Sequence, residues 1–268
     1  MQTSTSYRNL RGFGCRKSME LINEKLLGFV MVLTRISAFF LILPVFGWKS
    51  IPVRIKVAMT ILVTVFFSMI IPVPIESKQV SVVESVLLLT NEATYGLALG
   101  LIVAFVFASV KFSGRIIERQ MGLAMAQILD PLSGENTQAL GALLEMIFIL
   151  LFLSANGHHL FLLIISRSYE TFPAGSIPTI PVLAGGIIKA GSTLLMAGLK
   201  LSAPILAAFL LLMVVLAVFA RMIPEMNILF ISLPMRVGMG LLMVAIFLPF
   251  INTFVAEFAD WMGKLLPL

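Results

Sequence analysis

The sequence has few charged residues and a single cysteine. Only 12% of its 268 residues are charged, whereas 59% are hydrophobic; a soluble domain carries about 25% charged residues. So few charges cannot cover the water-exposed surface of a fold of this size. Most of the outer surface must therefore face lipid or apolar protein. The lone Cys15 excludes an internal disulfide framework and a cysteine-based metal cluster.

The formal net charge of +6 does not indicate nucleic-acid binding. The excess lysines and arginines lie in short loops between apolar runs, where cationic residues report membrane orientation. A nucleic-acid-binding domain gathers its basic residues on one face or along one helix instead. We expect membrane lipid as a partner and no nucleic acid.

Long apolar runs follow one another along the chain. A bilayer core about 30 Å thick is crossed by a helix of roughly 20 apolar residues, and the alternating pattern of a β-barrel is absent. The sequence therefore predicts an all-α, polytopic membrane protein with about six apolar helices, forming one domain over residues 19–268. The runs are Leu26–Phe46, Val57–Ile71, Val86–Val110, Ala139–Ile165, Val182–Phe219 and Ile228–Phe250. The fifth is either one long bent helix or two short ones.

Residues 1–18 form a basic tail that has two interpretations. The later loops, judged by the positive-inside tendency, place the start of the first span outside the cytoplasm, which conflicts with a basic tail there. If translation begins at Met19 the conflict disappears, so we interpret the tail as a start-site artefact. The alternative is a genuine cytoplasmic extension. N-terminal sequencing of the native protein decides between them, since a start before Met19 refutes the artefact.

No catalytic or metal-binding constellation is visible. His158 and His159 are the two histidines of the chain and stand beside Asn156 in an apolar run, where a metal site needs further ligands. We interpret this group as a helix end or kink. No serine stands out with a paired base, and no Gly-rich, Lys-containing phosphate loop is present. The sequence predicts no enzyme, no catalytic residue, no cofactor and no metal site.

Charged residues also fall inside the apolar runs. They are Arg35, Glu92, Glu145, Lys189, Lys200 and Arg236. Such charges are costly in lipid and often mark substrate or ion paths, so a small-molecule or ion transporter with Glu92 or Glu145 as proton carrier is an alternative. We favour pairing with another subunit or snorkelling to an interface, because no inverted repeat is visible.

Small residues recur at four-residue spacing in the third run. Gly96, Gly100, Ala104 and Ala108 fall on one face of a helix. Such a strip lets two helices approach closely. We interpret it as a packing face for other helical subunits, with packing inside the chain as the alternative.

The segment Lys111–Leu129 is amphipathic rather than uniformly apolar, and a turn with Pro and Gly follows at residues 130–134. Met121 and Met125 line one face of it. Thioether side chains conform to irregular shapes, which suits a deformable seal. Ordinary packing is the alternative.

At these residues the sequence resembles a known family, the FliR family of flagellar export proteins. Matching segments occur in the family's order at residues 35–56 (RISAFFLILPVFGWKSIPVRIK), 120–134 (QMGLAMAQILDPLSG), 153–160 (LSANGHHL), 199–206 (LKLSAPIL) and 221–235 (RMIPEMNILFISLPM). The resemblance covers about residues 20–255. Residues 50–54 look closer to the flagellar branch than to the related injectisome subunits.

The resemblance implies a subunit of the type III protein-export gate in the bacterial inner membrane, in the flagellar basal body and required for flagellum assembly. FliR-like subunits pack as bent hairpins with FliP-like and FliQ-like subunits in a hetero-oligomeric gate that an FlhB-like subunit joins. Unfolded flagellar export substrates pass through its centre. The equivalent subunit of a virulence-type injectisome is the nearest alternative.

In that family the segment matching residues 120–137 forms a plug-like loop that closes the pore. By this resemblance we expect the constriction to be lined by Met121, Leu123, Met125, Ile128 and Leu129. The loop would be shaped by Gly122, Asp130, Pro131 and Gly134. Family members carry bulky aromatics where this chain has Met125 and Ile128. An apolar constriction remains, and such a constriction holds back ions by dewetting.

Overall fold

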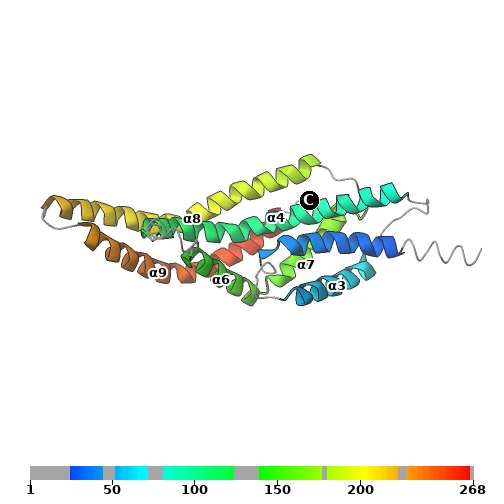
Figure 1. Ribbon diagram of the computed structural model, residues 1–268, viewed down its shortest axis with the longest axis horizontal. Coiled ribbons are helices and arrows are strands. Elements are labelled where there is room, and N and C mark those ends of the chain that lie inside the picture. The colour runs from blue at the N-terminus through cyan, green and yellow to red at the C-terminus, as the bar shows by residue number, and fades with distance from the viewer. Residues whose placement is uncertain are drawn as a thin grey trace, which may run out of the picture. The chain divides into compact units, whose positions relative to one another are not determined.

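The structure is a computed structural model that describes residues 25–44, 52–71, 81–123, 139–176, 180–222 and 228–265. Every regular element in these ranges is an α-helix, which confirms the all-α prediction. The helices are Lys25–Ile42, α3 (Val53–Ile70), α4 (Val82–Gln120), α6 (Ala139–Ser154), α7 (His158–Thr171), α8 (Ile180–Met222) and α9 (Ile228–Leu265) (Figure 1).

These helices have the length and composition of membrane spans. Among the described residues, five helices are long and apolar enough to cross a bilayer, or six if the bent pair α6 and α7 counts as one span. The polytopic prediction is therefore confirmed. The fifth predicted run is one continuous helix of 43 residues, α8, with Pro204 inside it.

The third predicted apolar run, Val86–Val110, lies inside a longer helix. α4 has 39 residues and continues to Gln120, so residues 111–120 extend this helix instead of forming a separate amphipathic element. The greater polarity of these residues ends the apolar run. A change of polarity does not end a helix, however, and α4 contains no proline that would remove a backbone donor.

α6 and α7 are bent by 76° at a break over residues 155–157. Asn156 adopts a left-handed backbone conformation with φ 58°, which asparagine tolerates better than most residues. The Gly157 amide donates to the Phe152 carbonyl at 2.8 Å and closes the end of α6. A side chain at Gly157 would overlap the Phe152 ring. The kink predicted at this polar group is confirmed.

The chain divides into two compact units. Unit 1 comprises residues 1–101, 162–187 and 268, and unit 2 comprises residues 102–161 and 188–267. α4, α7 and α8 each contribute residues to both units. Residues 1–18 lie outside the described residues, so the interpretation of the N-terminal tail stays a prediction.

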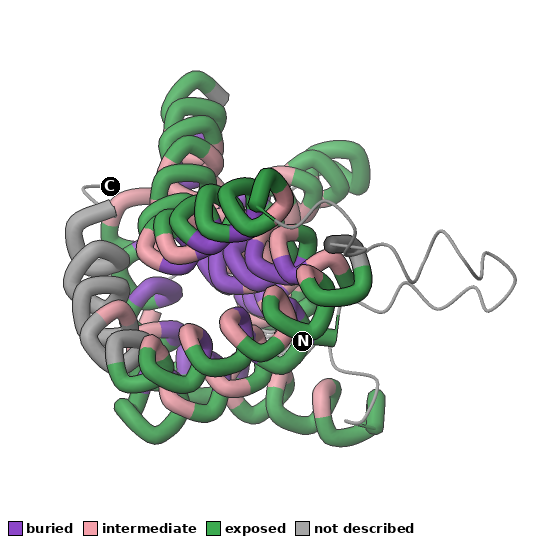
Figure 2. The backbone as a smooth tube through the Cα atoms, turned by 90° about the vertical axis from the view of Figure 1, so that its left-hand side faces the viewer, coloured by how far each residue is buried: buried purple, intermediate pink, exposed green. Residues whose placement is uncertain are grey.

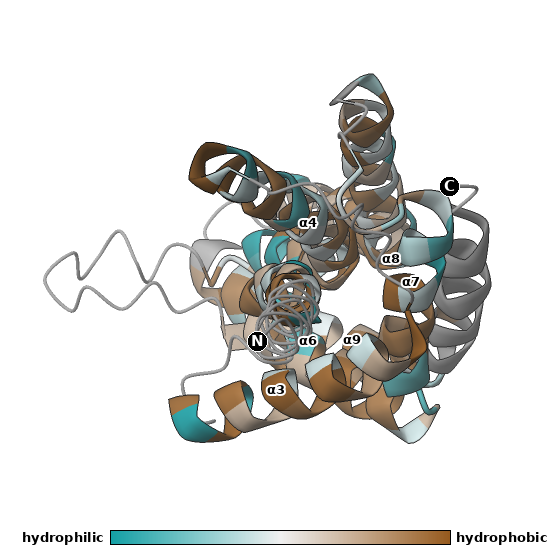
Figure 3. Cartoon of the chain, turned by 90° about the vertical axis from the view of Figure 1, so that its right-hand side faces the viewer, coloured by the Kyte–Doolittle hydropathy of each residue, from teal (hydrophilic) through white to brown (hydrophobic). Residues whose placement is uncertain are grey.

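Much of the apolar surface of the described helices is exposed. Exposed residues, in green, run along large parts of them in Figure 2. α3 buries only Thr64 and Phe67, although most of it carries the brown of apolar residues in Figure 3. An apolar surface of this extent requires lipid or other protein around it.

Candidate functional site

The core of unit 1 contains a buried ion pair between the helix Lys25–Ile42 and α4. Arg35 Nε donates to Glu92 Oε2 at 2.6 Å, and Arg35 Nη2 donates to Glu92 Oε1 at 3.1 Å. The two side chains are 1% and 0% exposed. The third nitrogen, Nη1, donates to the Phe172 carbonyl at 3.0 Å and lies 3.4 Å from the carbonyl and hydroxyl oxygens of Ser168. Every nitrogen of the guanidinium therefore has an acceptor.

Two aromatic rings and one backbone amide complete this centre. The guanidinium carbon of Arg35 lies 4.1 Å from the ring centroid of Tyr169 and 4.8 Å from that of Tyr95, at distances typical of cation–π contacts. The Gly175 amide donates to Glu92 Oε1 at 2.8 Å. The centre thus joins the first described helix, α4, α7 and the turn after α7.

This arrangement corrects the expectation that the embedded charges meet other subunits. Arg35 and Glu92 compensate each other inside unit 1, because a buried charge is tolerated only with a partner and with its hydrogen bonds satisfied. They stand 57 positions apart in the sequence. Neither this pairing nor the roles of Tyr95 and Tyr169 could be found from local spacing.

The predicted small-residue strip packs partly within the chain. A Cβ at Gly96 would overlap the Arg35 carbonyl oxygen, and one at Gly100 would lie 3.0 Å from the Phe39 carbonyl oxygen. Both glycines let α4 approach the helix Lys25–Ile42 closely, so here the structure favours packing inside the chain. Ala104 and Ala108, in unit 2, are half-buried.

A second ion pair lies in unit 2 and is more accessible. Lys111 Nζ lies 3.0 Å from Glu145 Oε2, with side chains 37% and 15% exposed. Glu92 and Glu145, the two carboxylates considered for a proton carrier, therefore both pair with a cation in their own unit. Lys189 and Lys200 are exposed on α8, which suits snorkelling.

The interior of unit 2 is aromatic. The side chains of Phe107, Phe148, Phe152 and Phe161 pack with ring centroids 5.2 to 6.4 Å apart. α4 and α6 approach each other closely where two glycines meet, since a Cβ on Gly114 would lie 2.6 Å from the Gly141 Cα. The packing of unit 2 therefore depends on how closely these rings and the helix surfaces at the glycines fit together.

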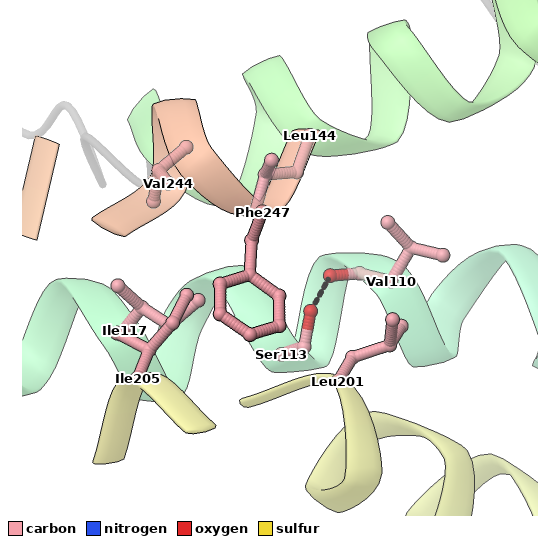
Figure 4. A pocket seen from close by; sticks show the side chains of 8 residues that line it. All are labelled: Val110, Ser113, Ile117, Leu144, Leu201, Ile205, Val244 and Phe247. Carbon is pink, nitrogen blue, oxygen red and sulfur yellow. Dashed lines mark hydrogen bonds between the residues drawn. The ribbon is translucent and has the colours of Figure 1, made fainter. Parts of the chain in front are cut away.

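A small cavity of about 40 Å³ lies between α4, α6, α8 and α9 in unit 2 (Figure 4). It is lined by Val110, Ser113, Ile117, Leu144, Leu201, Ile205, Val244 and Phe247. The Ser113 hydroxyl already donates to the Val110 carbonyl at 2.8 Å, as the dashed line in Figure 4 shows. Pockets for small molecules measure about 300–1,000 Å³. This cavity is a packing gap without the size or the polar groups of a substrate site.

The beginning of the predicted plug lies at the C-terminal end of α4. Gly122 has φ 81° and Leu123 is 37% exposed, whereas Met121 is 1% exposed. The Met121 side chain packs against Gly240 of α9, a residue that the sequence analysis missed. Its one local signal is its occurrence as a glycine within an apolar run. The remaining predicted lining residues (Met125, Ile128, Leu129) and loop-shaping residues (Asp130, Pro131, Gly134) lie outside the described residues.

No group of three or more His, Cys, Asp or Glu side chains comes together in the described parts of the chain. The rings of His158 and His159 lie 4.3 Å apart at the start of α7. The prediction that the chain has no metal site rests on the sequence.

Comparison with known proteins gives consistent matches over most of the chain. Residues 26–261 match the family model of bacterial export proteins, family 1. The flagellar biosynthetic protein FliR of Escherichia coli (strain K12) is 31% identical over 222 residues, which cover 83% of this chain and 84% of that protein. FliR of Bacillus subtilis (strain 168) is 30% identical, with 81% and 85% covered. FliR of Aquifex aeolicus (strain VF5) is 28% identical, with 89% and 92% covered.

Proposed function

The chain belongs to bacterial export protein family 1, and we propose that it lines and plugs the channel through which a flagellar type III export gate passes unfolded substrates. As a FliR-type protein it is a component of the flagellar export apparatus in the bacterial inner membrane, and it is not an enzyme. FliP-like, FliQ-like and FlhB-like subunits are its proposed partners.

The observation that carries the plug is the abrupt end of α4. The Gly122 amide donates to the Arg119 carbonyl at 3.1 Å, and its positive φ ends the helix as glycine commonly does. Leu123 follows with 37% of its surface exposed. The segment proposed as the plug, residues 120–137, therefore leaves α4 with an apolar side chain uncovered.

The exposed apolar faces support the proposed assembly. The residues Leu62 on α3 and Leu211 and Met222 on α8 are 67%, 66% and 74% exposed. Helices that are this apolar and this uncovered suit close packing with sister helices. Substrates would cross at the centre of such an assembly, outside any cavity of this chain.

The mechanism is physical rather than chemical. A narrow apolar ring excludes water and so blocks ions when no substrate is present. Leu123, Met125, Ile128 and Leu129 are the proposed ring, and Gly122, Asp130, Pro131 and Gly134 the proposed supports of the loop. Met121 packs against Gly240 of α9, so we do not include it in the proposed ring. Other subunits must supply the energy for transport.

The test replaces the two central plug residues in the assembled gate. Met125→Ala combined with Ile128→Ala widens the apolar ring, so ion conductance of the purified complex in lipid bilayers should rise. Met125→Leu combined with Ile128→Leu keeps the apolar volume and should raise conductance less. Unchanged conductance of the alanine variant, with partner subunits still co-purifying, would remove the plug assignment.

A solute transporter is not favoured, because Glu92 and Glu145 are each paired within their own unit. The export proposal also implies that the isolated chain is unstable without partner subunits. A chain that is monodisperse in detergent and carries a solute alone would contradict it. Loss of motility on deletion separates the flagellar role from that of an injectisome subunit.

A further inference from the structure

Met121, the residue after α4, packs directly against Gly240 of α9. A Cβ on Gly240 would lie 2.5 Å from Met121 Cγ, 2.7 Å from its Sδ and 2.9 Å from its Cε. Real Cβ atoms essentially never approach other atoms closer than 3.0 Å. Three atoms of the Met121 side chain therefore fill the space that any other residue at position 240 would need.

The exposure of the side chains rises sharply between residues 121 and 123. Met121 is 1% exposed, and Leu123 is 37% exposed. Between them, a Cβ on Gly122 would have no neighbour within 4 Å. Met121 is thus the last buried residue in the described range 81–123, just ahead of the proposed ring residues.

Gly238, two residues away on the same helix, has no such neighbour. A Cβ there would meet nothing within 4 Å, and the residue is exposed, whereas Gly240 is buried. Glycine inside a helix costs about 1 kcal/mol relative to alanine. At position 240 the contact with Met121 gives a structural reason for that cost, and position 238 is a matched control.

We propose that the contact between Met121 and Gly240 anchors the C-terminal end of α4 on α9 and so fixes where the plug starts. Gly240 is then a positioning residue for the closed pore, and Met121 acts by packing rather than by lining the channel. This inference rests on the proposed function.

The first test is Gly240→Ala in the assembled complex. The alanine methyl group displaces the Met121 side chain, which is flexible enough to change rotamer without unfolding the unit. Ion leak through the closed complex should rise about tenfold, equivalent to about 1.4 kcal/mol lost from the closed state. Gly238→Ala should leave the leak at the parent level. An unchanged leak in Gly240→Ala overturns the inference.

A double-mutant cycle ties the effect to Met121. Met121→Ala removes Cγ, Sδ and Cε, the three atoms that the new methyl group would strike. Gly240→Ala should therefore add no further leak in the Met121→Ala background, because coupled residues are not additive. An equal rise in both backgrounds shows that Gly240 acts without Met121 and overturns the inference.

Cross-linking tests the contact itself, independently of leak and of assembly defects in Gly240→Ala. With Cys15→Ser removing the one native thiol, Met121→Cys with Gly240→Cys should form an intramolecular disulfide in oxidised membranes. Met121→Cys with Gly238→Cys should not. Failure of the first pair to cross-link, or equal cross-linking of both pairs, overturns the anchor.

The outcomes separate the anchor from the plug. If the Met125→Ala, Ile128→Ala variant leaks and Gly240→Ala does not, the anchor is wrong and the plug stands. If neither leaks, both are wrong. If both leak and the cycle is non-additive, both are supported.

Discussion

The two units of the chain hold their helices by different physical means. Unit 1 is centred on the Arg35–Glu92 ion pair. The pair has further hydrogen bonds to the Phe172 carbonyl and from the Gly175 amide, and two tyrosine rings lie beside the guanidinium. Unit 2 is centred on four phenylalanine rings and on helices that touch at glycines. Unit 1 therefore depends on the chemical identity of its groups, and unit 2 on their shape.

The environment explains why both solutions work. In an apolar surrounding an unpaired charge costs several kcal/mol, so a satisfied pair resists rearrangement. Lipid is as apolar as phenylalanine or leucine, so apolar helices gain little from merely meeting each other and must fit closely. A substitution that roughly keeps the volume of a side chain should therefore reduce stability more in unit 1 than in unit 2.

The largest effect is expected from Glu92→Gln. The change keeps size and one oxygen but leaves Arg35 buried without a counter-charge, and removing one partner of a buried pair costs about 3–5 kcal/mol. The measurement is the stability of this chain, within the purified complex, against denaturation by SDS or heat. Stability within error of the parent would show that the ion pair does not hold unit 1.

Glu145→Gln is the matched control for that change. It makes the same substitution in the pair with Lys111, whose side chain is 37% exposed. Partly exposed pairs contribute about 0–1 kcal/mol. An equal loss in the two variants would mean that burial does not distinguish the pairs.

A smaller effect is expected from Gly96→Ala, which tests close packing in unit 1. The methyl group would overlap the Arg35 carbonyl oxygen, a backbone atom that cannot turn away, and such overpacking costs about 1–3 kcal/mol. Gly185→Ala on α8, also in unit 1, meets nothing within 4 Å. It should raise stability by up to about 1 kcal/mol through helix propensity. The same denaturation assay compares the two, and equal changes would contradict the close contact.

A smaller loss than that of Glu92→Gln is expected from Phe152→Leu in unit 2. Phe152 is 1% exposed, but leucine keeps most of the apolar volume, so the loss should stay below the about 3–5 kcal/mol that replacement of a buried phenylalanine by alanine costs. The same denaturation assay compares Phe152→Leu with the parent protein and with Glu92→Gln. If Phe152→Leu proves the more harmful variant, the contrast between a chemical and a shape-dependent core is wrong.

Local pattern predicted the elements of this fold well and their ends less well. The described helices overlap the predicted apolar runs, and the bend between α6 and α7 lies at the predicted polar group around Asn156. The apolar run that ends at Val110 does not show where α4 ends, ten residues later at Gln120, because a change of polarity does not stop a helix. Side-chain hydrogen bonds and burial across helices do not appear in such patterns.

The sequence by itself determined that this is an apolar, multi-helical chain and, through its resemblance to a family, what kind of apparatus contains it. Run length and charge content are sufficient for that, because they depend on residues close together in the chain. Only the tertiary structure decided that Arg35 meets Glu92 and that Met121 sits on Gly240. Each of these contacts joins residues far apart in sequence, and packing among helices, not local preference, selects which distant residues meet.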